Sequence, residues 1–313
     1  MNQGIIKIKI KDTLNLSGKS WLVDNPKANV MIVSGMEEHS SRYDALAKFL
    51  NDNRYSCHSL DYFGQGENVK SKEQILGNVP EHAFQLYTDG LANYVRSIKG
   101  DLPLYVLGHS MGSFLSQEFS QRHPDLVDKL VIVGSNGPDP MFGLGFLLAR
   151  ITVRRRGYDR TSNLLAGLAI GTYQKSIKNA KTNCDWITYN EENVTEYLKD
   201  PLSGITSSRG FYKELLRGTS RLYKKKNVLR MNKDLPILII SGQDDPVGKK
   251  GKGVEKLYGM YLKYNFKHVN MKLYPMMRHE ILNEKDKLKV FSDVLDFLKI
   301  GHVNQTAFIG ENE

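Results

Sequence analysis

The 313-residue sequence lacks the features that stabilise small secreted proteins or anchor proteins in membranes. Its two cysteines, Cys57 and Cys184, are far apart, so the sequence predicts neither a disulfide framework nor a thiolate metal site. No run approaches the roughly 18 apolar residues that a membrane span needs. Residues 1–10 alternate apolar residues with lysine, which is typical of a strand and not of a signal peptide. We therefore expect a soluble, cytoplasmic protein with two free thiols.

What the chain has is an apolar content of 40% and a net charge of +10. The whole charge excess lies in residues 141–230, which hold 17 basic and 7 acidic residues and leave 27 of each sign elsewhere. No zinc spacing, aromatic-rich binding strand or recognition-helix pattern accompanies it, so we expect no nucleic-acid partner. The asymmetry indicates two parts with different tasks.

Most of the chain alternates short apolar strands with amphipathic helices. This rhythm predicts a doubly wound, mostly parallel α/β sheet of about eight strands, preceded by an N-terminal hairpin near residues 12–15. The expected strands include residues 29–33, 55–60, 102–107, 130–133, 236–240 and 269–274, and the expected helices include 42–51, 82–98, 111–122 and 285–298.

The pattern is interrupted between residues 136 and 228, where irregular, helical stretches carry the charge excess. We interpret this segment as a mainly helical cap inserted into a core. The core then consists of residues 1–135 and 229–313.

One turn carries a candidate nucleophile. Gly108-x-Ser110-x-Gly112 fits the nucleophile elbow, in which a serine lies on a tight turn between a strand and a helix. The tripartite pattern alone is weak, but this copy follows an apolar strand and precedes a helix. The helix N-terminus there favours an oxyanion. A tight turn with an incidental serine is the structural alternative.

A serine hydroxyl needs a base, which in turn needs a carboxylate to orient it. His279 follows the strand 269–274, so we expect it to be the base. Asp245 follows the strand 236–240 and is the expected acid, with Asp244 as its competitor for that role. His109 and His39 are the rival histidines; His109 adjoins Ser110, and His39 fits a loop-stabilising role.

Four stretches resemble the monoacylglycerol lipase and bacterial lysophospholipase branch of the α/β-hydrolases, a group of serine aminopeptidase S33-like enzymes. The resemblance covers nearly the whole chain, including Asp185-Trp186 and the stretch 200–204 of the expected cap. The four stretches are residues 34–43 (SGMEEHSSRY), 61–66 (DYFGQG), 108–112 (GHSMG) and 278–284 (RHEILNE).

The resemblance implies a serine hydrolase that cleaves the ester bond of single-chain lipids, such as monoacylglycerols or lysophospholipids. It implies Ser110, Asp245 and His279 as the triad, with the backbone N–H groups of Met36 and Met111 as the oxyanion hole. It implies no metal and no cofactor. The alternatives are a short-chain carboxylesterase, a peptidase of the proline-iminopeptidase type, and a catalytically silent fold that only binds a ligand.

Three positions depart from the pattern of that branch. Ser34 stands where the branch usually has histidine, Glu37 replaces a typical glycine, and Gln65 stands where the branch has histidine between two glycines. These departures bear on the geometry and polarity of the oxyanion loop and on substrate range, and they leave the triad intact.

The expected cap places apolar residues 142–148 beside Arg150 and the arginine cluster 154–156, and it ends with the lysine cluster 224–226. Such a combination suits peripheral contact with an anionic membrane surface, from which a lipid ester enters the site. The alternative is that the apolar stretches pack against the sheet or line the pocket while the charges are solvated.

Overall fold

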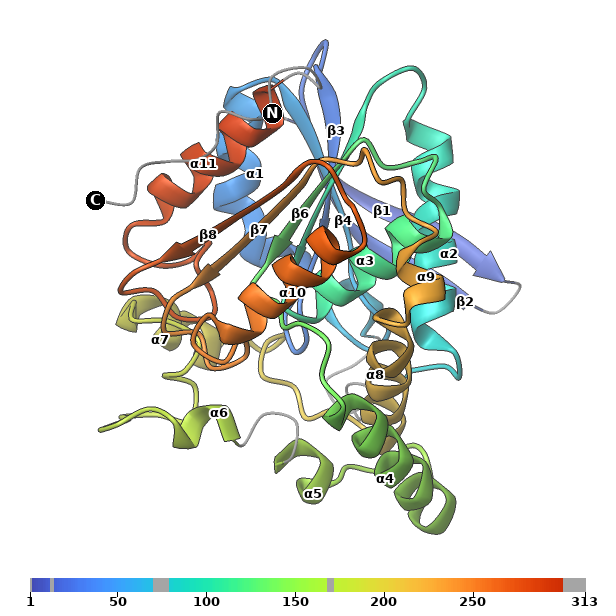
Figure 1. Ribbon diagram of the computed structural model, residues 1–313, viewed down its shortest axis with the longest axis vertical. Coiled ribbons are helices and arrows are strands. Elements are labelled where there is room, and N and C mark those ends of the chain that lie inside the picture. The colour runs from blue at the N-terminus through green and yellow to red at the C-terminus, as the bar shows by residue number, and fades with distance from the viewer. Residues whose placement is uncertain (1, 12–13, 70–78, 168–171, 301–313) are drawn as a thin grey trace.

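The chain forms one eight-stranded sheet with helices on both faces (Figure 1), which confirms the predicted fold class. The computed structural model describes residues 2–11, 14–69, 79–167 and 172–300. The strand order is β1-β2-β4-β3-β5-β6-β7-β8. The strands are β1 Asn2–Lys11, β2 Leu14–Leu22, β3 Ala28–Val33, β4 Tyr55–Leu60, β5 Leu104–His109, β6 Lys129–Val133, β7 Ile237–Gly242 and β8 Val269–Tyr274.

The first two strands pair antiparallel, as the predicted hairpin requires, although residues 12 and 13 of its turn lie outside the described residues. β2 pairs antiparallel with β4. All pairs from β4 to β8 are parallel. β3, β6 and β7 are buried along their whole length, because helices cover both faces of a parallel sheet.

Two helix layers enclose the sheet. α1 and α11 cover one face, and α2, α3 and α10 cover the other (Figure 1). β3 shows the alternation that results: Val30 and Ile32 pack toward α1 and α11, whereas Met31 and Val33 pack toward the other layer. The bounds are α1 Asp44–Asp52, α2 Ala83–Ile98, α3 Met111–Arg122, α10 Lys252–Lys263 and α11 Lys287–Lys299.

The predicted helices lie within a few residues of the observed ones, but they do not include α10. Val254, Leu257 and Tyr261 bury one face of α10 with helical spacing. Gly253 and Gly259 interrupt this pattern in the sequence, and glycine lowers intrinsic helix propensity. Packing of the buried face against the sheet compensates for that low propensity.

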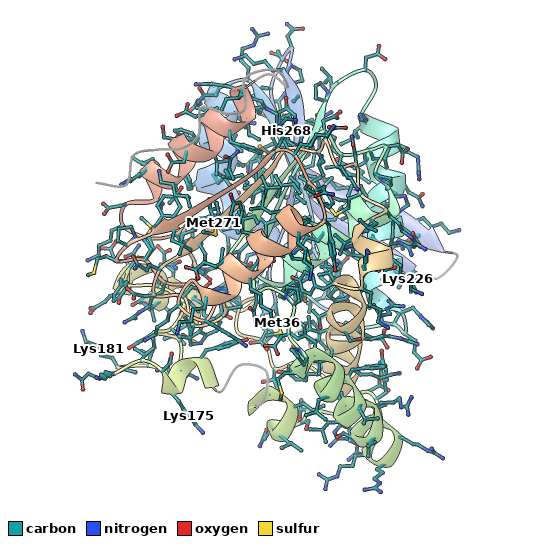
Figure 2. The ribbon with its side chains drawn as sticks, in the orientation of Figure 1. Met36, Lys175, Lys181, Lys226, His268 and Met271 are labelled. Carbon is teal, nitrogen blue, oxygen red and sulfur yellow. The ribbon has the colours of Figure 1, made fainter. Side chains whose placement is uncertain are left out.

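The strand order reverses at β3: β4, the next strand in the chain, lies on one side of β3, and β5 lies on the other side. Ligand sites in open α/β sheets lie at such a reversal, outside the carboxyl ends of the strands. Figure 2 shows Met36, just after β3, at the end of the sheet opposite His268, which precedes β8. The loops after β3 and β5 therefore start from adjacent positions.

The segment between β6 and β7, here called the insert, contributes no strand to the sheet within its described part. α4 packs along α8, and α4, α5 and α6 lie beyond the carboxyl ends of the strands (Figure 1). The division into core and cap stays a prediction. The helices of the insert are α4 Met141–Arg156, α5 Asn163–Ala166, α6 Thr172–Lys175, α7 Glu191–Lys199, α8 Arg209–Leu222 and α9 Lys225–Val228.

None of the helices in the described part of the chain has the length and apolarity to span a bilayer.

Candidate active site

Ser110 lies in a strained turn between β5 and α3. Its backbone angles are φ 53° and ψ −122°, a conformation that non-glycine residues rarely adopt. The turn is possible because two glycines let the backbones approach closely. A Cβ at Gly112 would lie 2.0 Å from Val33 O, and one at Gly108 would lie 2.4 Å from Gly112 O. Such strain is typical of functional positions.

The loops after β7 and β8 bring Asp245 and His279 together. His279 Nδ1 lies 3.1 Å from Asp245 Oδ1 and 3.0 Å from Oδ2. Asp245 is completely buried, and it also accepts hydrogen bonds from Val247 N at 2.8 Å and Ser241 Oγ at 3.0 Å. Burial alone would raise the pKa of Asp245, but the His279 ring and these donors lower it below its usual value. The carboxylate therefore stays charged beside the imidazole.

Asp244 is placed differently from Asp245. Its side chain accepts a hydrogen bond from Tyr189 OH at 3.1 Å, and its amide donates to Met277 O at 3.0 Å. The structure thus brings Asp245, and not Asp244, against His279.

One cavity of about 90 Å³ joins these parts. Ser110, His279, Met36 and Met111, four of the expected site residues, all line it. Its other lining residues are Glu37, Glu38, His109, Phe114, Tyr173, Trp186, Ile187, Tyr197, Leu215, Val247 and Glu280.

The loop that carries Met36 is fixed by Gln65. Gln65 Nε2 donates to the carbonyls of Gly35 and Glu38, each at 3.1 Å, and Gln65 Oε1 accepts from Glu37 N at 3.0 Å. Gln65 is buried, so these bonds are shielded from water. Met111 is the first residue of α3, and its N–H has no acceptor within that helix. Met36 and Met111 both line the cavity, and their role as an oxyanion hole stays a prediction.

Glu38 is the centre of a buried network beneath the loop. It accepts hydrogen bonds from Tyr43 OH at 2.7 Å, from the amide of Gly35, and from His109 Nδ1 at 2.9 Å. Burial alone would raise the pKa of Glu38, but His109, Arg42 and Tyr43 outweigh burial and lower it to about 2. Glu38 therefore stays charged, and its charge is balanced by His109 and Arg42.

The two rival histidines have structural partners. His109 Nε2 lies 3.2 Å from the carbonyl oxygen of His279, so His109 bridges Glu38 and the His279 loop. His39 Nε2 lies 2.6 Å from Asp200 Oδ2 of the insert.

The insert supplies the opposite wall of the cavity. The Trp186 ring lies 5.2 Å from the His279 ring, measured between centroids, and Glu280 N donates to Ile187 O at 2.6 Å. Arg42 Nη2 bonds to Glu280 Oε2 at 2.7 Å and to Asn193 Oδ1 at 3.0 Å. These contacts fasten the insert to the two loops that flank the cavity.

In residues 2–11, 14–69, 79–167 and 172–300, no three His, Cys, Asp or Glu side chains are grouped so that they could hold a metal ion.

Comparison with known proteins places this arrangement in a family. The family model described as serine aminopeptidase, S33, matches residues 24–286, which is most of the chain. The chain belongs to this family. It is thus an α/β-hydrolase of the lipase and esterase group.

Relatives in the family carry lipase and phospholipase names. A monoglyceride lipase homolog from monkeypox virus is 26% identical over 280 residues, covering 87% of this chain and 88% of the relative. Phospholipase YtpA from Bacillus subtilis is 26% identical over 277 residues, covering 87% of this chain and 95% of the relative.

Solved structures share the fold. A thermostable carboxyl esterase from Bacillus coagulans superposes with a TM-score of 0.86 at 22% identity, over 95% of this chain and 98% of the esterase. A soluble variant of monoglyceride lipase from Saccharomyces cerevisiae gives 0.74 at 21% identity, over 95% and 94%.

The sequence alone does not show which residues around the cavity form its hydrogen-bond network. Glu38, Arg42 and Trp186 occur in stretches that carry the resemblance, but the sequence gives no sign of which partners they meet. Their partners lie up to 238 residues away, as for Arg42 and Glu280. Gln65 was noted as a departure, and its role as the clamp of the loop comes only from the structure.

Proposed function

We propose that this chain is a serine hydrolase that cleaves the carboxylic ester bond of single-chain lipids, monoacylglycerols or lysophospholipids, through an acyl-serine intermediate. The observation that carries the proposal is the shared cavity of Ser110 and His279, with His279 Nδ1 held 3.0 Å from buried Asp245. In this proposal Ser110 is the nucleophile, His279 the base and Asp245 the orienting acid.

The geometry supports the following reaction. With Nδ1–H directed to Asp245, His279 Nε2 is the nitrogen that takes the proton of Ser110 as Oγ attacks the acyl carbonyl. The oxyanion accepts hydrogen bonds from the amides of Met36 and Met111. His279 then gives its proton to the departing alcohol. Water, activated by His279, attacks the acyl-serine and releases the fatty acid and free Ser110.

The lining of the cavity supports an apolar acyl group. Phe114 from α3, Leu215 from α8 and Val247 after β7 contribute apolar side chains, and Glu37 and Glu38 of the loop after β3 contribute carboxylates. The lining thus offers apolar contacts to an acyl chain and polar groups to a headgroup. The names of the viral and Bacillus relatives agree with a lipid ester as substrate.

The small volume favours a second candidate, a short-chain carboxylesterase. The cavity of about 90 Å³ is well below the volume of about 300 Å³ or more that is usual for sites of drug-sized ligands. A long acyl chain requires the insert to move outward. A series of p-nitrophenyl esters decides between the two: a rate that falls steeply beyond about four carbons supports the short-chain esterase.

We further propose that the outer end of the insert docks on an anionic lipid surface. Along α4, the residues Met141, Leu144, Leu147 and Ile151 recur every three or four positions and are exposed by 61, 58, 46 and 41%. Exposed Arg150 and the arginines 154–156 lie on the same helix. A helix with apolar residues beside cations suits a membrane interface.

Other apolar residues of α4 and α5 are used internally. Phe142 packs against Phe114 and Tyr223, and Leu165 is buried, so part of this segment packs inside as the structural alternative predicts. Lys226 lies away from α4 and α5 in Figure 2, so we base docking on α4. Co-sedimentation with liposomes tests it: binding should rise with the anionic lipid fraction and fall with salt. Binding that changes with neither the anionic lipid fraction nor the salt concentration contradicts the docking.

The decisive test of the function is fatty-acid release from 1-monoacylglycerol and from lysophosphatidylcholine with the same acyl chain. Wild type should release fatty acid, and Ser110→Ala should not. Ser97→Ala, the same change at an exposed position of α2, should behave as wild type. A fluorophosphonate should label wild type and not Ser110→Ala. A folded wild type that neither labels nor hydrolyses any ester would refute the proposal in favour of a silent fold. Activity on an aminoacyl-arylamide alone would favour the peptidase.

A further inference from the structure

Three carboxylates line the cavity, and two of them are neutralised by the protein. Glu38 lies 2.9 Å from His109 Nδ1 and 3.7 Å from Arg42 Nε. Glu280 lies 2.7 Å from Arg42 Nη2 and accepts from Asn193 Nδ2 at 2.6 Å. The third, Glu37, has no Lys, Arg or His nitrogen within 4.0 Å among the described residues. Its hydrogen bond from Ser207 Oγ is long, at 3.4 Å.

The backbone of Glu37 is held in an unfavourable conformation. Its φ is 61°, in the region that favours glycine. Gln65 fixes its amide, while Gly204 N at 2.9 Å and Tyr197 OH at 3.2 Å both donate to its carbonyl. A glycine would satisfy the same three bonds without strain. The presence of a carboxylate at this position therefore indicates a use for the side chain.

In the part of the chain that the structure describes, no ion pair within 4.0 Å balances the Glu37 carboxyl. Burial raises its pKa to about 7, against the smaller opposing effect of the Ser207 hydrogen bond. A carboxyl of this kind binds hydroxyl groups well, because it accepts hydrogen bonds when charged and both donates and accepts when protonated. When charged, it repels a phosphate group.

We propose that Glu37 forms a headgroup subsite that binds the hydroxyls of a neutral polyol ester and rejects headgroups that carry a phosphate. This inference rests on the proposed function and selects within it monoacylglycerol over lysophospholipid. Glu37 directly follows Met36, whose amide binds the oxyanion in the proposed mechanism, and Glu37 lines the same cavity as Ser110 and His279. The headgroup of an ester that reacts in this cavity therefore has the Glu37 carboxyl among its neighbours.

The test compares two substrates with the same acyl chain: 1-monoacylglycerol, and lysophosphatidylglycerol, whose headgroup carries a phosphate and no cation. At pH 8, wild type should favour monoacylglycerol in kcat/KM. In Glu37→Gln this preference should fall about tenfold or more, through a weaker reaction with the polyol and a stronger one with the phosphate ester. Glu37→Gly, which also removes the backbone strain at this position, should lose the preference for monoacylglycerol as well. Glu192→Gln, the same change on the exposed side of α7, should keep the wild-type ratio.

A pH series separates recognition from a structural role. Between pH 8 and pH 6 the preference of wild type should shrink, because the carboxylate becomes protonated and no longer repels the phosphate. A protonation that affects both substrates alike cancels in the ratio, and the ratio of Glu37→Gln should stay flat. Tyr197 of α7, Tyr212 of α8 and Cys184 also face Glu37, and burial raises the pKa of each above its usual value, so they stay uncharged in this range. The pKa of Glu38 is lowered to about 2, so Glu38 stays charged, and Glu280 is paired with Arg42. Burial alone would lower the pKa of His109, but Glu38 outweighs the effect of burial and raises it. His109 is present in both wild type and Glu37→Gln, so the variant controls for it.

The outcomes distinguish the two proposals. A wild type that hydrolyses both lipids with a preference that Glu37→Gln moves by less than twofold overturns the subsite and leaves the proposed function intact. A preference for lysophosphatidylglycerol in wild type also overturns it. If wild type hydrolyses neither lipid and is not labelled by a fluorophosphonate, the proposed function itself fails.

Discussion

The sheet side of the cavity and the outer end of the insert differ in how their side chains are held. On the sheet side, Ser110 is fixed by a strained turn that two glycines permit, and Asp245 is fully buried with three partners. At the outer end of the insert, α4 leaves a stripe of apolar side chains in solvent beside exposed arginines. This contrast fits the roles proposed for the two regions, bond cleavage beside the sheet and lipid docking at α4. Such a division lets one fold serve many substrates.

The strongest test of this contrast is on the sheet side. Asp245→Asn should reduce kcat about 10⁴-fold, because His279 loses the partner that fixes its tautomer and stabilises its charge. Asp244→Asn, one residue earlier and bonded to Tyr189, should stay within a few-fold of wild type. Steady-state kinetics on one soluble ester measures both. Equal losses of kcat in the two variants would contradict the different roles that the geometry indicates for Asp245 and Asp244.

A smaller effect is expected at the base of the loop that carries Met36. Gln65→Ala removes three hydrogen bonds to that loop and should lower kcat by about ten- to hundredfold, with a smaller change in KM. Gln3→Ala, the same change at an exposed position of β1, is the matched control and should leave kcat unchanged. A pure rise in KM would instead assign Gln65 to substrate binding.

On the insert side, the double change Leu144→Ser and Leu147→Ser should weaken binding to anionic vesicles about tenfold, since it removes exposed apolar area from α4. Turnover of a soluble ester should be unchanged. Leu198→Ser removes a side chain that is 50% exposed on α7 and should leave vesicle binding as it is. Equal effects of both variants would contradict a docking face on α4.

The smallest effect concerns stability. The pKa of Glu37 is raised from 4.5 to about 7, so the folded state binds a proton more tightly than the unfolded chain does. The resulting stability is complete below about pH 4.5 and is lost as the pH rises through about 7. Glu37→Gln should therefore raise Tm by about 2 °C or more at pH 8, with a smaller or no gain at pH 5. Thermal unfolding at the two pH values checks this sign.

The sequence allowed the sheet to be predicted from its short apolar strands. It also predicted the turn at Ser110 and placed Asp245 and His279 at the ends of neighbouring strands, where the structure brings them into contact. The Glu38 network and the clamp by Gln65 were not predictable. Each depends on side chains from separate loops that meet only after the sheet has formed, and hydrogen-bonding residues carry no periodicity that signals their partners. The split use of α4, with Phe142 inside and Leu144 outside, likewise depends on where α8 lies.

The order of the strands also has a consequence for biosynthesis. Ser110 emerges from the ribosome early and takes its place in the middle of the sheet, between β3 and β6. Its partners Asp245 and His279 follow β7 and β8, which are synthesised only after the whole insert. Because long-range pairing comes late in folding, we expect a nascent chain to contain Ser110 before the histidine proposed as its base reaches it. Reactivity of Ser110 toward a fluorophosphonate would therefore mark the moment at which the last strand docks.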